Sequence, residues 1–115
     1  MSYSIKTTST FDKEYKRLAK RYPSLKQEII NLAKGLTSNP ETGTDLGKGL
    51  RKVRLAIASK GRGKSGGARV ITFKTDAIVR VDEGTITLIT MYDKSERDSI
   101  SDKELRNILK NSNLL

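Results

Sequence analysis

The fold is decided by residues 48–74, KGLRKVRLAIASKGRGKSGGARVITFK. Within them, apolar residues alternate with polar or small ones over residues 52–57, KVRLAI, which is the period-two pattern of a strand with one face in a core. A second β-rich run, VITF, begins at Val70, and a segment of glycine, serine and basic residues separates the two runs. We therefore predict a hairpin with apolar side chains in a core and cationic side chains facing outward.

The net charge of the chain lies almost wholly in this stretch. The chain has 23 basic and 13 acidic residues, a formal net charge of +10. Nine of the basic residues and none of the acidic ones fall within residues 48–74, which leaves 14 basic against 13 acidic residues elsewhere. Charge gathered in one segment favours a polyanionic partner, with nucleic acid ahead of an anionic membrane.

Several classes of protein are excluded by what the chain lacks. A length of 115 residues predicts one domain, residues 1–115. With no cysteine and no histidine, a disulfide framework, a thiolate or histidine metal site and histidine-based proton transfer are ruled out. Metal-dependent phosphoryl chemistry needs clustered carboxylates, and Asp76 is the only acid near the hairpin, so we expect no metal and no other cofactor. Neither a membrane-spanning run nor an apolar signal core is present, so we expect no membrane partner and a cytoplasmic protein.

Three helices are predicted from apolar spacing and capping residues. The first covers residues 9–22 and ends before Pro23, because the residue before a proline is pushed out of the helical region. The second runs from residue 24 to Asn39-Pro40, and the third covers residues 101–111. The predicted N-caps are serines, two of them in capping boxes: Ser9, Ser24 with Gln27, and Ser101 with Glu104.

The remaining segments predict the rest of a sheet. Residues 1–8 are an edge strand or a loose arm, and residues 41–49 are a polar connector. After the hairpin, residues 77–81 resume as a strand, a turn follows at residues 82–84, and residues 86–92, ITLITMY, form a central strand. The predicted fold is α+β: two N-terminal helices, a twisted antiparallel sheet of three to four strands and a C-terminal helix, with the helices on one face.

The basic hairpin suits chemistry on phosphodiesters. Arginine binds two phosphate oxygens at once through its planar guanidinium, and lysine acts as a point charge. The same groups could stabilise a pentacoordinate phosphorus while a ribose 2′-hydroxyl attacks. Without histidine, the base would be a lysine with a lowered pKa or a Tyr92 phenolate beside Lys94. The residues by themselves permit two classes, a passive nucleic-acid binder and a metal-free ribonuclease.

Two segments resemble the RelE/HigB branch of the toxins of bacterial type II toxin–antitoxin systems: GLRKVRLAIASKGRGKSGGARVITF and LITMYDKSERDSISDKELRNIL. The resemblance runs from about Phe11 to Lys110, and its most specific part is KGRGKSGGARVI followed by MYDKSE. It implies the same fold and a ribosome-dependent endonuclease that cuts mRNA in the ribosomal A site. It also implies a cognate antitoxin, and contact with operator DNA only through the antitoxin complex.

The resemblance also assigns roles to residues. Lys52 and Arg54 match the paired cations that family members use for base catalysis and phosphate binding, and Arg69 matches the arginine that stabilises the transition state. Lys94 falls where RelE proper has an arginine proposed as general acid. RelE proper has a catalytic tyrosine where this chain has residues 98–100, DSI, and Tyr92 is the candidate that replaces it.

Further cations are expected to grip ribosomal RNA rather than do chemistry. They lie in or beside the glycine-rich loop and the first basic strand: Lys48, Arg51, Lys60, Arg62 and Lys64. A ParE-like gyrase poison, which shares the fold, and a non-catalytic nucleic-acid-binding module remain the alternatives. The set formed by Lys52, Arg54, Arg69 and Lys94 favours the ribonuclease.

Overall fold

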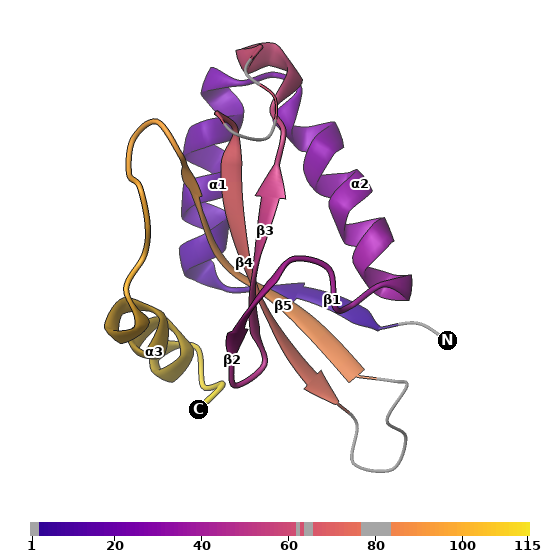
Figure 1. The fold of residues 1–115 in the computed structure, drawn as a ribbon, viewed down its shortest axis with the longest axis vertical. Helices are drawn as coiled ribbons and strands as arrows, with labels where there is room; N and C mark the ends of the chain where they lie inside the picture. The colour runs from indigo at the N-terminus through magenta and orange to yellow at the C-terminus, as the bar shows by residue number, and fades with distance from the viewer. Residues whose placement is uncertain (1–2, 62, 64–65, 77–83) are drawn as a thin grey trace.

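The computed structural model describes residues 3–61, 63, 66–76 and 84–115. Its elements, in chain order, are β1 (Ser4–Thr7), α1 (Ser9–Arg21), α2 (Leu25–Ser38), β2 (Thr44–Gly47), β3 (Leu50–Leu55), the 3₁₀ turn η1 (Ala58–Lys60), β4 (Ala68–Asp76), β5 (Gly84–Asp93) and α3 (Asp102–Asn111). The predicted α+β class is confirmed, with two helices before the sheet and one after it (Figure 1). None of the helices described is long and apolar enough to cross a membrane.

The sheet has five strands in the order β1-β5-β4-β3-β2. The antiparallel β3–β4–β5 centre agrees with the prediction. The predicted count and the wholly antiparallel arrangement are wrong, because β1 joins the edge parallel to β5 and the connector at residues 41–49 contains β2. No tight turn links β1 to β5, so only tertiary packing decides its direction. The strand predicted at residues 77–81 lies outside the described residues, as do residues 82 and 83 of the turn.

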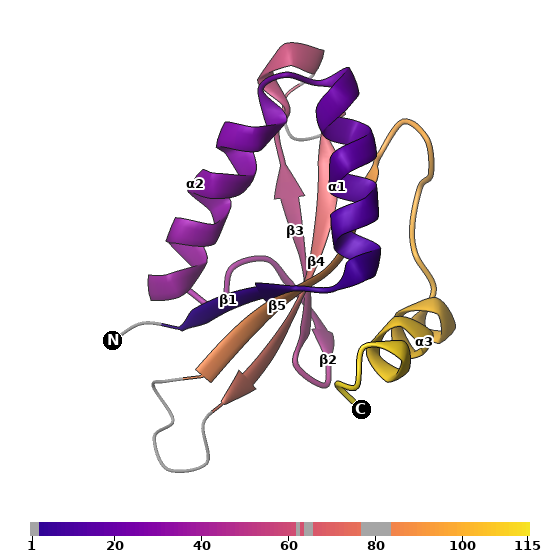
Figure 2. The same cartoon turned by 180° about the vertical axis from the view of Figure 1, so that it is seen from behind.

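The helices cover both faces of the sheet, which corrects the prediction that they share one. α1 and α2 pack over a core that includes Val53, Val70 and Met91, and Figure 2 shows these two helices in front of the strands. α3 packs through Leu105, Ile108 and Leu109 on the opposite face, over Leu50, Ile71 and Ile89. Because side chains alternate along a strand, β3, β4 and β5 each contribute apolar side chains to both cores.

The helix starts are only partly as predicted. Ser101 accepts a hydrogen bond from the backbone N–H of Glu104 at 3.1 Å, so its capping role is confirmed. The cap of α1 is Thr8, whose hydroxyl accepts from the N–H of Phe11. Ser24 makes no side-chain capping bond, because its hydroxyl is used by Glu28 and by Ser59 of η1. Local spacing located the helix ends to within a residue or two, but tertiary partners decided these contacts.

Candidate functional site

Three predicted site residues form a row across the centre of the sheet. Arg54 of β3 pairs with Arg69 of β4, and Arg69 pairs with Tyr92 of β5. Directly paired residues point to the same side of a sheet, with Cβ atoms roughly 4.5–5.5 Å apart. Ile71, two residues from Arg69, packs against α3, so the row lies on the α3 side. We call Arg54, Arg69 and Tyr92 the central row.

Two lysines flank the central row along the strand direction. Lys52 pairs with Ile71 and therefore shares the side of Arg54. At the other end Lys94 follows Tyr92 by two residues, and its backbone N–H donates to the carbonyl of Gly67 at 3.0 Å. The structure thus brings four predicted cations to one side of the sheet, which we call the cationic face: Lys52, Arg54, Arg69 and Lys94.

The cations of this face differ in burial. Arg69 is only 5 % exposed, and its Nη1 donates to the Ala68 carbonyl at 3.1 Å. Arg54 is exposed and Lys52 is half-buried. Within the described part of the chain, the side chains of Lys52 and Arg54 make no hydrogen bond or ion pair, so both can receive an anionic ligand.

Tyr92 lies in the central row but is almost wholly buried. The residue is 3 % exposed, and its hydroxyl is buried with no hydrogen-bond partner among the described residues. The Arg97 guanidinium stacks over the ring, 5.6 Å from the ring centroid. β5 does neighbour the Arg69 strand, as the prediction required.

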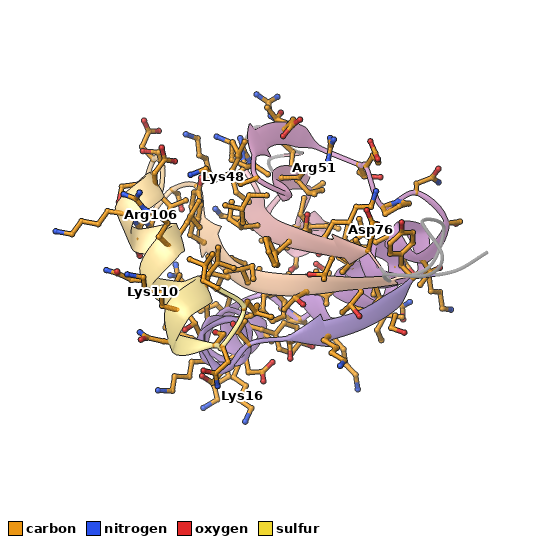
Figure 3. All side chains as sticks on the ribbon, turned by 90° about the horizontal axis from the view of Figure 1, so that it is seen from below. Lys16, Lys48, Arg51, Asp76, Arg106 and Lys110 are labelled. Carbon is orange, nitrogen blue, oxygen red and sulfur yellow. The ribbon has the colours of Figure 1, made fainter. Side chains whose placement is uncertain are left out.

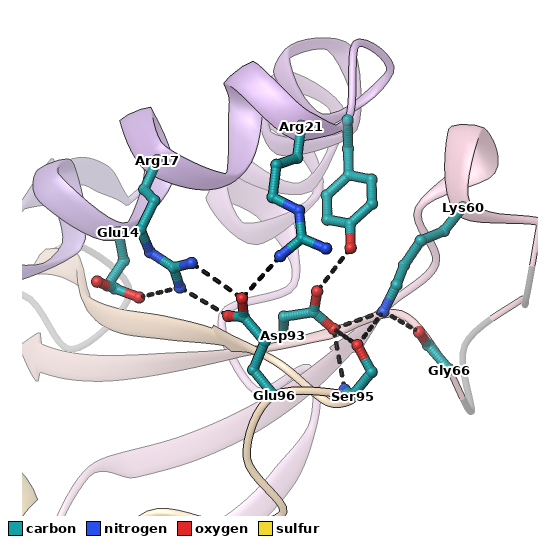
Figure 4. A network of polar contacts seen from close by, with 9 residues as sticks. Glu14, Arg17, Arg21, Lys60, Gly66, Asp93, Ser95 and Glu96 are labelled. Carbon is teal, nitrogen blue, oxygen red and sulfur yellow. Dashed lines mark hydrogen bonds and ion pairs between the residues drawn. The ribbon is translucent and has the colours of Figure 1, made fainter.

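A buried carboxylate behind the cationic face was missed by the sequence analysis. Asp93, at the end of β5, is fully buried. It accepts hydrogen bonds from the hydroxyl of Tyr22 at 2.8 Å, the ammonium of Lys60 at 2.5 Å, and the N–H and hydroxyl of Ser95. Figure 4 shows Lys60 and Ser95 converging on this carboxylate. Burial alone would raise the pKa of Asp93, but the bonds from Lys60, Ser95 and Tyr22 outweigh it and hold the pKa well below its usual range.

The side chain of Lys60, which was predicted to bind RNA, makes its contacts inside the protein. Its side chain is 8 % exposed, and its ammonium also donates to the Gly66 carbonyl at 2.8 Å and to the hydroxyl of Ser95 at 3.0 Å. All three ammonium protons therefore have partners inside the protein. Lys60 ties the segment after β3 to the end of β5, and so fixes both edges of the cationic face.

A second ion-pair cluster fixes the loop that follows β5. The carboxylate of Glu96 accepts from Arg17 at 3.0 and 2.7 Å and from Arg21 at 2.8 Å, both on α1 (Figure 4). The Arg17 hydrogen bonds lower the pKa of Glu96. Further along the loop, the ammonium of Lys94 binds the carboxylate of Asp98 at 2.5 Å and its carbonyl at 2.8 Å. The MYDKSE motif therefore supplies the anchors of this loop as well as its cations.

The remaining predicted RNA-binding residues do not gather on the cationic face. Arg51 points to the α1/α2 side, where it binds the Glu41 carbonyl at 3.0 Å, and in Figure 3 it lies away from α3. Lys48 is exposed in the β2–β3 turn and lines a small cavity with Arg106 of α3. Arg62 and Lys64 lie outside the described residues. Nowhere in the described ranges do three acidic side chains gather closely enough to hold a metal ion.

The fold and the face together define a class of protein: a small α+β domain that presents arginine and lysine side chains on one side of a mixed sheet. The chain belongs to the RelE toxin family, because the family model described as "RelE toxin of RelE / RelB toxin-antitoxin system" matches residues 5–115. No curated protein matches the chain. Toxins of this family are generally endoribonucleases, and membership implies an antitoxin partner.

Proposed function

We propose that this toxin is a ribosome-dependent endoribonuclease that cleaves mRNA in the A site without a metal ion, and so stops translation. The observation that carries the proposal is the pairing of Arg54 with Arg69 on adjacent strands, with Lys52 and Lys94 on the same side. Four cations on one rigid sheet provide the charge that a scissile phosphate needs. The family membership supplies the RNA substrate class.

Each cation of the face has a distinct task in this reaction. Arg54 and Arg69 bind the non-bridging oxygens of the scissile phosphate, and Arg69 stabilises the extra charge as the ribose 2′-oxygen attacks phosphorus. Lys52 contacts the neighbouring backbone and, once deprotonated, takes the proton of the attacking 2′-hydroxyl, as the resemblance implies for the Lys52/Arg54 pair, and Lys94 donates a proton to the departing 5′-oxygen. The products are a 2′,3′-cyclic phosphate and a 5′-hydroxyl. Tyr92 supports the row by packing, since its hydroxyl is buried.

The ribosome is needed because, in the part of the chain that the structure describes, the four cations lie along one side of a sheet. A 2′-hydroxyl attacks efficiently only when it is held in line with the departing oxygen, and such alignment is worth several orders of magnitude in rate. A strand surface with an exposed Arg54 provides charge without enclosing a nucleotide. The ribosome holds the mRNA in the A site and supplies this alignment.

The antitoxin prevents the reaction by keeping the toxin off the ribosome. Operator DNA is contacted only through the toxin–antitoxin complex.

The ends of the cleaved RNA test the mechanism. In a purified translation system, we expect wild-type protein to produce 5′-hydroxyl and 2′,3′-cyclic phosphate ends on a defined mRNA, because the ribose hydroxyl is the nucleophile. Ends with a 5′-phosphate and a 3′-hydroxyl would contradict 2′-hydroxyl attack. Absence of cleavage, with loss of gyrase supercoiling activity instead, would replace the proposal with a gyrase poison.

Neutralising Lys52 is expected to weaken ribosome binding and to flatten its salt dependence. One lost phosphate contact removes about 0.7–0.9 from the slope of log affinity against log salt. The measurement is binding of Lys52→Gln to ribosomes carrying an mRNA with 2′-deoxyribose in the A-site codon, at several salt concentrations. The matched control is Lys26→Gln, an exposed lysine of α2 on the other side of the sheet, whose slope should equal that of wild type. An unchanged slope for Lys52→Gln would remove Lys52 from the interface.

A further inference from the structure

A small cavity lies between the β2–β3 turn and α3, on the same side of the sheet as the cationic face. Its volume is about 190 Å³. Leu50, which lines it, precedes Lys52 by two residues on β3 and therefore points to the same side. Leu50 also packs against α3. We call this space the α3 cavity, and its lining residues are Leu46, Gly47, Lys48, Leu50, Asp102 and Arg106.

A β-bulge presents Leu46 to the α3 cavity. Asp45 pairs with Arg51 and Gly47 pairs with Leu50, so Leu46 is the extra residue on β2. The Asp45 carboxylate accepts a hydrogen bond from the Gly47 N–H at 2.7 Å, which holds the bulge. Leu46 is 38 % exposed, although it is large and apolar. Bulges redirect side chains and are common next to active sites, so this exposed leucine suits a ligand contact.

The turn after the bulge holds a lysine in a backbone conformation that costs free energy. Lys48 has a φ of 55° and Gly49 a φ of 87°, and together they form the turn between the paired Gly47 and Leu50. Glycine adopts positive φ readily, whereas a residue with a Cβ atom does so at a cost. Strained residues of this kind gather at ligand-binding sites. The lysine is exposed and lines the cavity, so the turn places a cation beside Leu46.

Two cations at the α3 cavity are available to a ligand. Lys48 comes from the turn and Arg106 from α3, and both are exposed (Figure 3). Within the described ranges, neither side chain makes a hydrogen bond or an ion pair. Asp102, four residues before Arg106 on α3, lines the same space and adds a hydrogen-bond acceptor. Apolar surface, cations and an acceptor together match a nucleotide, which has a flat apolar base with polar edges and an anionic phosphate.

We propose that the α3 cavity binds the base of an unpaired mRNA nucleotide near the scissile phosphate. The inference rests on the proposed function and deepens it. Leu50 lies four residues from Arg54 on the same side of β3, which is about 13 Å along the strand. An mRNA strand whose scissile phosphate lies at Arg54 and Arg69 can therefore place a neighbouring base at the cavity. A protein segment is the less favoured occupant, because the cavity and the scissile-phosphate site share one side of the sheet.

Each lining group has a task in holding the nucleotide. The side chains of Leu46 and Leu50 contact the face of the base, and the Arg106 guanidinium stacks on it, as arginine does on unstacked RNA bases. Lys48 binds the adjoining phosphate as a point charge, and Asp102 accepts from an amino group at the base edge. The cavity is smaller than the roughly 300–1,000 Å³ of a drug-sized site, so it admits one base rather than a whole nucleotide.

The test compares Leu46→Ser with Ile30→Ser, a matched change on α2 at the same 38 % exposure. Single-turnover cleavage is measured at subsaturating protein on ribosomes programmed with mRNAs that are abasic at each A-site position in turn. On intact mRNA, we expect Leu46→Ser to lower the rate by about 5–20-fold, near the low end for one stacked base because leucine is not aromatic. On the mRNA that lacks the bound base, Leu46→Ser should cleave at the wild-type rate for that mRNA, because the two changes remove the same contact. Ile30→Ser should match wild type on every mRNA.

Arg106→Gln tests the same contact from α3. It should lower the rate on intact mRNA and have no effect on the same abasic mRNA, and thermal melts of both variants should resemble wild type because both positions are exposed. Equal losses on intact and abasic mRNAs would assign the cavity to ribosomal RNA and overturn the proposal. Wild-type cleavage by both variants would overturn it and leave the nuclease intact, and weaker antitoxin binding by them would then identify a protein segment as the occupant. Wild-type protein that cuts no RNA would overturn the proposed function as well.

Discussion

Arg69→Lys is expected to lower the single-turnover rate of mRNA cleavage by about 10²–10³-fold, the usual cost of removing one donor from a transition-state anion. Arg69 lies at the middle of the central row, between Arg54 and Tyr92. At 5 % exposure its guanidinium acts in a poorly solvated setting, where charge interactions are strong. Lysine keeps the charge but lacks the planar fork that binds two phosphate oxygens together.

The matched control for this variant is Arg21→Lys, at an exposed position of α1 on the other side of the sheet. It makes the same chemical change away from the cationic face and should cleave at the wild-type rate. Ribosome affinity of Arg69→Lys should change far less than its rate constant, because the charge remains. A fully active Arg69→Lys would indicate that the face only binds nucleic acid, and would favour the non-catalytic module over the nuclease.

Asp93→Asn is expected to destabilise the protein by about 3–5 kcal/mol, the usual cost of breaking a buried ion pair from one side. The carboxylate of Asp93 is fully buried and joins three segments through Tyr22, Lys60 and Ser95. Without its charge, the ammonium of Lys60 stays inside the protein uncompensated. The measurement is urea unfolding at neutral pH, with Asp45→Asn on the exposed strand β2 as a control that should change little.

The same carboxylate makes a prediction about acid. Because the folded pKa of Asp93 lies below its usual range, its ionised form stabilises the fold above the unfolded pKa of about 3.9. That contribution is lost as the pH falls toward the folded pKa. The free energy of unfolding of wild type should therefore fall below about pH 4, and Asp93→Asn should lose less over the same range. Equal acid sensitivity of the two proteins would contradict this role.

The elements that local patterns specify were the ones the sequence predicted well. Apolar spacing and capping residues located all three helices, and alternation over residues 52–57 placed Lys52 and Arg54 on one side of a strand. Arg69 joined them because antiparallel pairing in a hairpin brings residues of two neighbouring strands together. These features depend on residues close in sequence.

The features that the sequence did not predict depend on long-range packing. The alternation of β3 places Leu50 and Val53 on opposite sides of the sheet but does not say which helix covers each, so α3 was assigned to the wrong face. In the sequence, Lys60 does not differ from the other cations of the glycine-rich segment. Only the fold brings it to Asp93, 33 residues away.

Primer extension on a defined mRNA tests the central claim most directly. Wild type and Arg69→Ala would each be compared in a purified translation system, with and without ribosomes. The account predicts new 5′ ends within codons only when wild-type protein and ribosomes are both present. Equally rapid cutting of naked mRNA, or the same new ends with Arg69→Ala, would contradict a ribosome-dependent nuclease that acts through the cationic face.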